Sequence, residues 1–294
     1  MLFRLFLPVI LAAMSTICRA EIIDPFDIPA LESDEVPYRS INIESGVSGN
    51  DSSFWSVGGS LDINQYWRTD FTYGETRYQL PDEIIVTDDN QFAIIYNATD
   101  MISLGLEYEF EGSDNQIEIH SKSIPIIISF NSFYLGIAPV KRDIRLFTSI
   151  VLPKKQDGYF DIESNGYRLD AMLSTSSLTR LTAGYETYNY DVDVTKLASS
   201  PLAMLLLKPA ALDRSSGFID NNRYIGAYLL LDTVELGLEL ERTRSAIDGS
   251  HADQINVSSL YTLNRHWDLG LLLTRSETPL STADGASLSL HYNW

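Results

Sequence analysis

The sequence predicts an all-β protein, a closed antiparallel transmembrane β-barrel of about fourteen strands, with twelve or sixteen as the alternatives. Three observations lead to this fold class. Apolar and polar residues alternate through most of residues 39–294, several alternating runs reach about ten residues, and the connections between them are alternately tight and long. A tilted strand of about nine to eleven residues is long enough to cross the hydrocarbon of a membrane.

The alternation is clearest near the C-terminus. In the last segment one face holds Ala286, Leu288, Leu290, Tyr292 and Trp294, and the other holds only Ser287, Ser289, His291 and Asn293. Such a pattern is also typical of a soluble sandwich with one buried face. The length of the runs favours the membrane. In a bilayer every backbone polar group needs an internal partner, so strands can cross it only as a closed barrel.

Turn residues and alternation together delimit fourteen expected strands. They cover residues 39–47, 53–62, 67–79, 91–97, 101–111, 116–129, 132–140, 165–173, 178–190, 223–231, 234–244, 252–262, 266–276 and 285–294. Two places weaken the count. Pro125 interrupts its own strand, because proline cannot donate a ladder hydrogen bond. Residues 143–164 could add another strand, since Ile144 and Leu146 alternate with charged residues.

The lengths of the connections predict which end of the barrel faces the periplasm. Tight turns at residues 64–65, 97–100, 174–177, 232–233 and 264–266 alternate with longer polar segments at 81–90, 111–115, 191–222, 246–252 and 276–285. Bacterial barrels have short periplasmic turns and long extracellular loops. Trp67 and Trp267 each follow a tight turn, where we expect an aromatic girdle at the membrane interface.

The N-terminal residues predict export. Residues 1–20 have Arg4 near the start, a short apolar run and the small residue Ala20 at the end, which is typical of a cleaved signal peptide. A membrane anchor is the alternative interpretation. Residues 21–38 contain three prolines among acidic residues and are expected to form a periplasmic tail or a small plug. The barrel would then occupy residues 39–294.

Composition limits the partners and the chemistry. The formal charge of −19 argues against nucleic acid, and against anionic lipid headgroups as electrostatic partners. It is compatible with a surface bridged by divalent cations, or with a lumen that favours cations. The only cysteine, Cys18, lies in the expected signal peptide, and the four histidines have no metal-ligand spacing. We therefore expect no metal site and no cofactor.

No residue pattern in the chain predicts a catalytic site, so the sequence predicts that the protein is not an enzyme. The segment Ser250-His251-Ala252-Asp253 has the residue types of a hydrolase triad, but sequence neighbours rarely converge in space. His120 is followed two positions later by Lys122 rather than by the serine that barrel phospholipases carry there.

If the apolar faces meet lipid, charged side chains of both signs point into the lumen. The expected lumen-lining residues are Arg68, Asp70, Glu107, Glu109, Arg168, Asp170, Arg180, Glu186, Glu235, Glu239, Glu241 and Asp268. A polar pore that favours cations is one interpretation. Gly237 lies between Glu235 and Glu239 on the same strand face and would leave room in such a pore. The other is that arginine–carboxylate pairs brace and close the interior. The apolar run within residues 197–207 belongs to a long loop that could constrict the barrel, lie on the membrane, meet a partner or pack on other loops.

The last strand resembles that of bacterial outer-membrane β-barrel proteins. Leu288, Leu290, Tyr292 and the final Trp294 match the family pattern of alternate apolar residues before a terminal aromatic residue, although Phe is commoner there. The resemblance implies a Gram-negative outer membrane, with its lipid and lipopolysaccharide, and an assembly signal read by periplasmic chaperones and the barrel-assembly machinery. It implies no activity.

Together these observations predict a porin-like passive channel for small polar or cationic solutes. A plugged structural or interaction barrel at the cell surface is the alternative, and a lipid-acting barrel enzyme is a third. Conductance separates the first from the second.

Overall fold

The computed structural model describes residues 38–49, 52–79, 84–113, 117–147, 159–195, 218–279 and 281–294. The expected signal peptide, the expected tail apart from Tyr38, and the apolar run within residues 197–207 lie outside the described residues. Within the described part no helix is long and apolar enough to cross a membrane.

Fifteen strand segments make fourteen crossings of the barrel wall. The segments are β1 (Arg39–Ser48), β2 (Ser52–Asn64), β3 (Trp67–Gln79), β4 (Ile84–Thr99), β5 (Ile102–Ser113), β6 (Ile117–Ser123), β7 (Ile126–Phe130), β8 (Phe133–Phe147), β9 (Tyr159–Ser176), β10 (Thr179–Tyr190), β11 (Ile219–Leu231), β12 (Val234–Ser245), β13 (His251–Asn264), β14 (Trp267–Glu277) and β15 (Thr282–Asn293). β6 and β7 are two halves of one crossing, because both pair with β5 on one side and β8 on the other. The predicted fourteen strands are confirmed.

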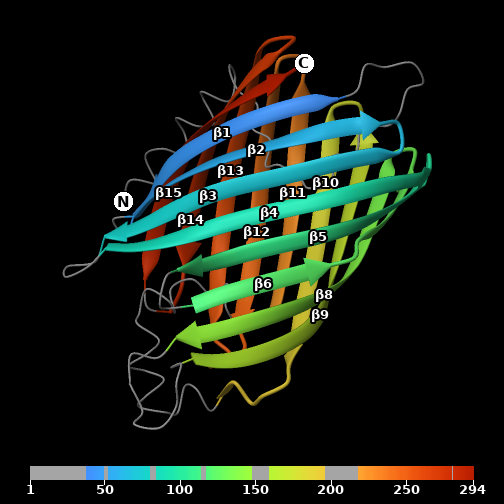
Figure 1. The fold of residues 1–294 in the computed structure, drawn as a ribbon. Helices are drawn as coiled ribbons and strands as arrows, with labels where there is room; N and C mark the ends of the chain where they lie inside the picture. The colour runs from blue at the N-terminus through green and yellow to red at the C-terminus, as the bar shows by residue number, and fades with distance from the viewer. Residues whose placement is uncertain are drawn as a thin grey trace, which may run out of the picture.

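The strands close into a complete ring. Each crossing is antiparallel to the next along the chain, and β1 pairs with β15 from Ser40↔Asn293 to Ser48↔Gly285. In Figure 1 the strands of the near wall, β1 to β6 with β8 and β9, cross those of the far wall at a steep angle. Closure leaves no unpaired sheet edge, as the membrane requires.

The break between β6 and β7 lies at Pro125. Its carbonyl still accepts a hydrogen bond from the Gly105 N–H at 2.8 Å, and the Ile124 N–H reaches the Pro139 carbonyl at 3.3 Å. A side chain at Gly105 would meet the Pro125 ring, since a Cβ there would lie 2.7 Å from Cγ. The missing proline N–H thus interrupts the ladder without opening the wall.

The two ends of the barrel differ as predicted. Six connections contain two residues each and lie at one end, together with the start of β1 and the end of β15. We call this the tight-turn end. The connections at the opposite, long-loop end run from three residues up to the segment 191–218. That the tight-turn end faces the periplasm stays a prediction.

Several strands reach further toward the long-loop end than predicted. β4 begins at Ile84 rather than residue 91, β8 continues to Phe147, and β9 begins at Tyr159, so the residues between 143 and 164 extend two strands instead of adding one. Asp88 and Asp89 fall in a predicted loop, but in the structure they belong to β4 and pair with β3. Alternation fails there as a signal because the outward residues leave the apolar band.

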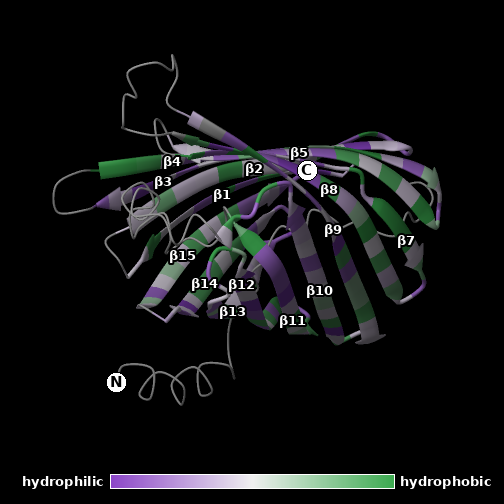
Figure 2. Cartoon of the chain, turned by 90° about the horizontal axis from the view of Figure 1, so that it is seen from below, coloured by the Kyte–Doolittle hydropathy of each residue, from purple (hydrophilic) through white to green (hydrophobic). Residues whose placement is uncertain are grey.

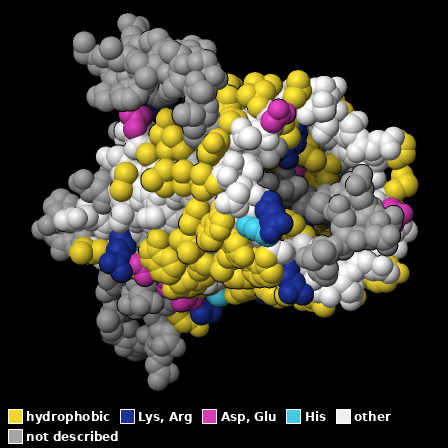
Figure 3. Space-filling view, turned by 90° about the horizontal axis from the view of Figure 1, so that it is seen from above, with side chains coloured by type: hydrophobic (Ala, Val, Ile, Leu, Met, Phe, Trp, Pro, Cys, Tyr) yellow, Lys and Arg dark blue, Asp and Glu magenta, His cyan; other side chains and the backbone are white. Residues whose placement is uncertain are grey.

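Apolar side chains form a band around the outside. Figure 2 shows the strands striped between hydrophilic and hydrophobic residues, and Figure 3 shows a broad hydrophobic area with charged side chains scattered around it. Exposed residues such as Ile43, Leu106, Ile225 and Leu288, at 56 to 62 % exposure, belong to this band. Rings cluster at its tight-turn edge, where Trp67 lies 4.8 Å from Tyr96.

Candidate functional site

The polar faces of the strands point into the barrel. Contacts between strands that are not neighbours include Arg168 of β9 with Glu107 of β5, Arg180 of β10 with Glu235 of β12, Tyr224 of β11 with Asp170 of β9, and Arg142 of β8 with the Tyr188 ring of β10. Side chains on the convex outer face diverge, so such contacts are made only from the inside. The interior therefore carries a connected polar network.

Arg168 is the centre of that network. Its Nη2 donates to Glu107 Oε2 at 2.7 Å, and its Nε lies 3.3 Å from Asp170 Oδ2. Glu107 also accepts from Ser123 Oγ at 2.5 Å and Gln91 Nε2 at 2.9 Å. The Glu107 side chain is only 7 % exposed. A buried carboxylate needs this many donors to offset its lost hydration.

A second group joins Arg180, Glu235 and Tyr228. Arg180 Nη2 lies 2.7 Å from both oxygens of Glu235, and the guanidinium stacks over the Tyr228 ring at 5.4 Å. A third group joins Arg68 to Asp70 at 2.9 Å and to Ser60 at 3.0 Å. These arginines neutralise the carboxylates that they contact.

Three of the remaining predicted lumen acids accept hydrogen bonds from neutral side chains. Glu186 accepts from Tyr188 Oη at 3.2 Å, Glu239 from Asn256 Nδ2 at 3.3 Å and Tyr228 Oη at 3.4 Å, and Glu241 from Asn222 Nδ2 at 2.8 Å. Glu186 and Glu239 lie close enough to Glu241 to repel it. Glu186 also lies opposite Arg168 of β9 in the register. We call Glu186, Glu239 and Glu241 the acidic group. It lies on β10 and β12, with β11 between them.

Two predicted lumen acids lie apart from this group. Asp268 accepts a hydrogen bond from Asn293 Nδ2 at 3.0 Å at the tight-turn end. Glu109 lies on the inward face of β5, two positions beyond Glu107, and is accessible to solvent.

Tyrosine rings fill the space beside two interior glycines. A Cβ at Gly184 would lie 2.1 Å from the Tyr224 ring, and one at Gly237 would lie 2.7 Å from the Tyr228 ring. The sequence suggested that Gly237 keeps the pore open between its acidic neighbours. The structure corrects this, because the glycine admits a tyrosine from the adjacent strand.

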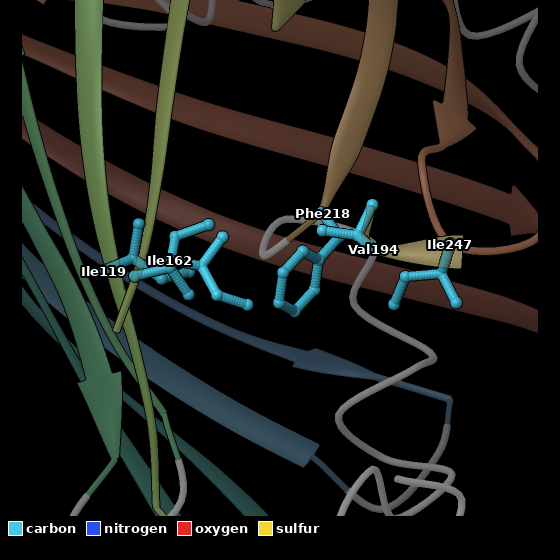
Figure 4. Packing of buried hydrophobic residues seen from close by; sticks show 6 residues of the cluster. Ile119, Ile162, Val194, Phe218 and Ile247 are labelled. Atoms are coloured by element: carbon cyan, nitrogen blue, oxygen red, sulfur yellow. The ribbon is translucent and has the colours of Figure 1, made fainter. Parts of the chain in front are cut away.

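An apolar cluster lies inside the long-loop end. Ile119 of β6, Ile144 of β8 and Ile162 of β9 are at most 4 % exposed and pack with residues from the loops. Figure 4 shows Val194, Phe218 and Ile247 on the side that faces Ile119 and Ile162. Val194 and Phe218 flank the undescribed part of the β10–β11 connection, and Ile247 belongs to the β12–β13 connection. We call these six residues the mouth cluster.

Charges replace apolar residues on the outer face of the same strands. This outer charged patch comprises Glu118, His120 and Lys122 of β6, Lys141, Asp143 and Arg145 of β8, and Asp161 and Glu163 of β9. Lys141 bridges Glu163 at 2.7 Å and Asp143 at 3.5 Å, and Arg145 lies 3.0 Å from Asp161. Here the polarity of the wall is inverted, with isoleucines inside and ion pairs outside.

The residues expected to form the assembly signal lie on the outer face at the tight-turn end. Leu288, Leu290 and Trp294 are exposed. Tyr292 packs between Trp267 at 4.6 Å and Trp294 at 5.5 Å. This geometry suits an aromatic girdle. Recognition by chaperones and assembly machinery stays a prediction.

Sequence reasoning missed several interior residues. Arg142 stacks over the Tyr188 ring at 4.8 Å, and Gln91, Ser123 and Tyr224 hold carboxylates of the network. Arg142 lies in residues 141–164, between two predicted strands, which the strand prediction left unassigned. For Tyr224 the available signal was a tyrosine on a polar strand face. Gln91 and Ser123 lie within predicted strands, and nothing in the sequence marks their partners.

The described residues show no group of three or more His, Cys, Asp or Glu that could hold a metal ion. His120 instead contacts Tyr108 Oη at 2.8 Å on the outer face. Ser250 bonds to Asp248 rather than to His251 or Asp253.

No family model and no curated protein matches this chain. Among solved structures it is similar to the CymD monoaromatic hydrocarbon channel, with 7% identity, a TM-score of 0.54 and 89% of each chain covered. It is also similar to the loop L8 deletion mutant of OmpT, an outer membrane protein of Vibrio cholerae, with 9% identity and a TM-score of 0.50 over 88% of this chain and 98% of that one. The fold is that of porin-like outer-membrane barrels.

Proposed function

We propose that this porin-like barrel is a passive channel for small polar solutes and that its interior favours cations. The acidic group carries the proposal. Glu107, Asp170 and Glu235 form ion pairs with arginines, whereas Glu186, Glu239 and Glu241 accept hydrogen bonds from tyrosine and asparagine. Only Glu186 of these three lies opposite an arginine, Arg168, which it shares with Glu107 and Asp170. Carboxylates in a confined lumen act through a lower effective dielectric than at an open surface, so they attract cations more strongly.

A closed structural barrel is the second candidate. It is favoured by the packing of Tyr224 and Tyr228 against interior glycines and by the mouth cluster, which fills part of the long-loop end. Neither role involves bond-making chemistry.

Reversal potentials in planar bilayers under a salt gradient test the channel. We expect a cation-selective conductance, and the variant E186Q/E239Q/E241Q should shift the reversal potential toward zero. The matched control is D143N/D161N/E163Q, which removes three carboxylates from the outer charged patch and should leave the reversal potential unchanged. Slower migration of boiled samples in SDS gels would show that both variants fold.

Three results would contradict the proposal in different ways. An anion-selective wild type would refute the acidic lumen. Equal shifts in both variants would mean that the overall charge, rather than the acidic group, sets the selectivity. An absence of conductance in folded protein would favour the closed barrel.

A further inference from the structure

The apolar band ends in a ring of aromatic side chains toward the long-loop end. On this edge Trp55 packs against Tyr73 at 5.4 Å, and Tyr167 lies 6.2 Å from Tyr185. All four side chains are exposed on the outer face. Tyrosine and tryptophan prefer the headgroup level of a membrane, so we take this edge as the second interface.

Arginines occupy the positions beyond the band on β11 and β12. Arg223 is the next outward residue after Ile225, and Arg242 is the next after Leu240. In the register Tyr185 pairs with Arg223, which in turn pairs directly with Arg242. Both arginines are exposed. Like charges placed directly opposite each other destabilise a strand pair, so this arrangement favours an anion between them.

The carboxylates nearby match these arginines only in part. Arg242 makes a two-pronged pair with Asp253, and Arg244 lies 3.2 Å from Asp220. Arg223 lies near Asp253, which Arg242 already pairs with, and no carboxylate of the described residues lies within ion-pair distance of Arg223 itself. In the outer charged patch on β6, β8 and β9, by contrast, each lysine and arginine contacts at least one carboxylate. The chain as a whole has a net charge of −19.

We propose that Arg223 and Arg242, with Arg244 beside them, bind the phosphate groups of phosphorylated lipid in the membrane leaflet at the long-loop end. Guanidinium groups match phosphate oxygens in pairs and are less strongly hydrated than ammonium groups. Ile225 and Leu240 are the neighbouring outward residues on the same strands, on the side of the apolar band, and both are exposed. They place the site where acyl chains meet headgroups, which favours a lipid over free phosphate.

The arginines on β11 and β12 change the expectation about anionic lipid that was drawn from the total charge. A chain with net charge −19 was expected to repel anionic headgroups or to bridge them through divalent cations. The arginine pair provides direct contact at one sector of the wall instead, and it needs no metal ion.

Binding of purified lipid A to detergent-folded full-length barrel tests the site. Native mass spectrometry in the presence of EDTA would compare diphosphorylated with dephosphorylated lipid A. We expect the variant R223Q/R242Q to bind the diphosphorylated lipid about tenfold more weakly, the loss of about one charge-assisted hydrogen bond. The control K122Q/K141Q removes the same charge from the outer charged patch and should bind like wild type. R223K should bind at an intermediate level.

Other results would overturn the proposal. Equal binding by wild type and R223Q/R242Q, or an equal loss in K122Q/K141Q, would show that these arginines are not the site. Wild-type binding that disappears in EDTA would mean that divalent cations make the contact. Inorganic phosphate that displaces the lipid at equal phosphate concentration would show an anion site without preference for lipid. The outcome is independent of conductance.

Discussion

The wall of this barrel has opposite polarity in two regions. Over most of its height, isoleucines and leucines face outward, and arginines, carboxylates and tyrosines fill the inside. At the long-loop end of β6, β8 and β9, Ile119, Ile144 and Ile162 face inward, while outward residues such as Lys141 and Asp143 form ion pairs. The same alternation therefore suits two different surroundings. Lipid surrounds the first region and water the second, and the boundary lies where the apolar residues change from the outer to the inner face.

The largest loss of stability is expected when an ion pair inside the first region is broken. The substitution R180Q leaves Glu235 as a buried charge without its guanidinium, and should lower the free energy of unfolding by about 3–5 kcal/mol. Urea unfolding in lipid vesicles would measure this. The double variant R180Q/E235Q should recover most of the loss, and a double variant as unstable as R180Q would contradict the pairing.

A charge on the outer face tests where the lipid ends. Leu238 is the middle one of three outward leucines on β12, so L238R should cost about 2–4 kcal/mol, as expected for arginine near the bilayer midplane. Asn165 is an exposed outward residue of β9 beside the outer charged patch, so N165R should change stability by only about 0.5 kcal/mol. Equal costs at the two positions would mean that lipid covers both regions.

A methylene deletion compares packing against protein with packing against lipid. Ile144 is 1 % exposed in the mouth cluster, and I144V should lower the free energy of unfolding by about 0.5–1.5 kcal/mol. Ile137, on the same strand, is 40 % exposed on the lipid-facing side, where acyl chains can fill the space. I137V should therefore cost less, and the reverse order would argue against a protein core at the mouth.

The smallest effect belongs to the ion pairs of the outer charged patch. The side chains of Lys141 and Glu163 are 45 % and 54 % exposed, so K141Q should lower the free energy of unfolding less than any of the substitutions above. The cost should shrink further in high salt, because exposed charges are screened. A salt-independent loss would indicate that the pair is shielded from water.

The barrel and its strand count could be predicted because the membrane demands paired backbone groups and one apolar face. Because of that demand, the outward direction of residues such as Leu236, Leu238 and Leu240 can be predicted from the sequence alone. The demand for an apolar face ends at the headgroups, and beyond them the predicted strand ends are wrong. There β4, β8 and β9 continue through Asp88, Asp143 and Asp161, which resemble loop residues in the sequence.

The inward or outward direction of a charged residue could be predicted, but not its partner. Arg168 reaches Glu107 across two intervening strands, and such a contact depends on barrel diameter and stagger. Alternation contains no information about either. For the same reason the sequence assigned Gly237 to open space and could not anticipate the ring of Tyr228 beside it.

The seam between β1 and β15 sets an order of events in folding. Every other strand pair joins segments that are close along the chain, whereas Ser40 must find Asn293. The entropy lost on closing a loop grows with its length by about 0.6 kcal/mol per doubling, so this pairing is the costliest to nucleate. Until it forms, the nascent sheet has two unpaired edges in a medium without water. At the base of this seam the Trp294 N–H donates to the Arg39 carbonyl at 3.0 Å, which joins the residue after β15 to the first residue of β1.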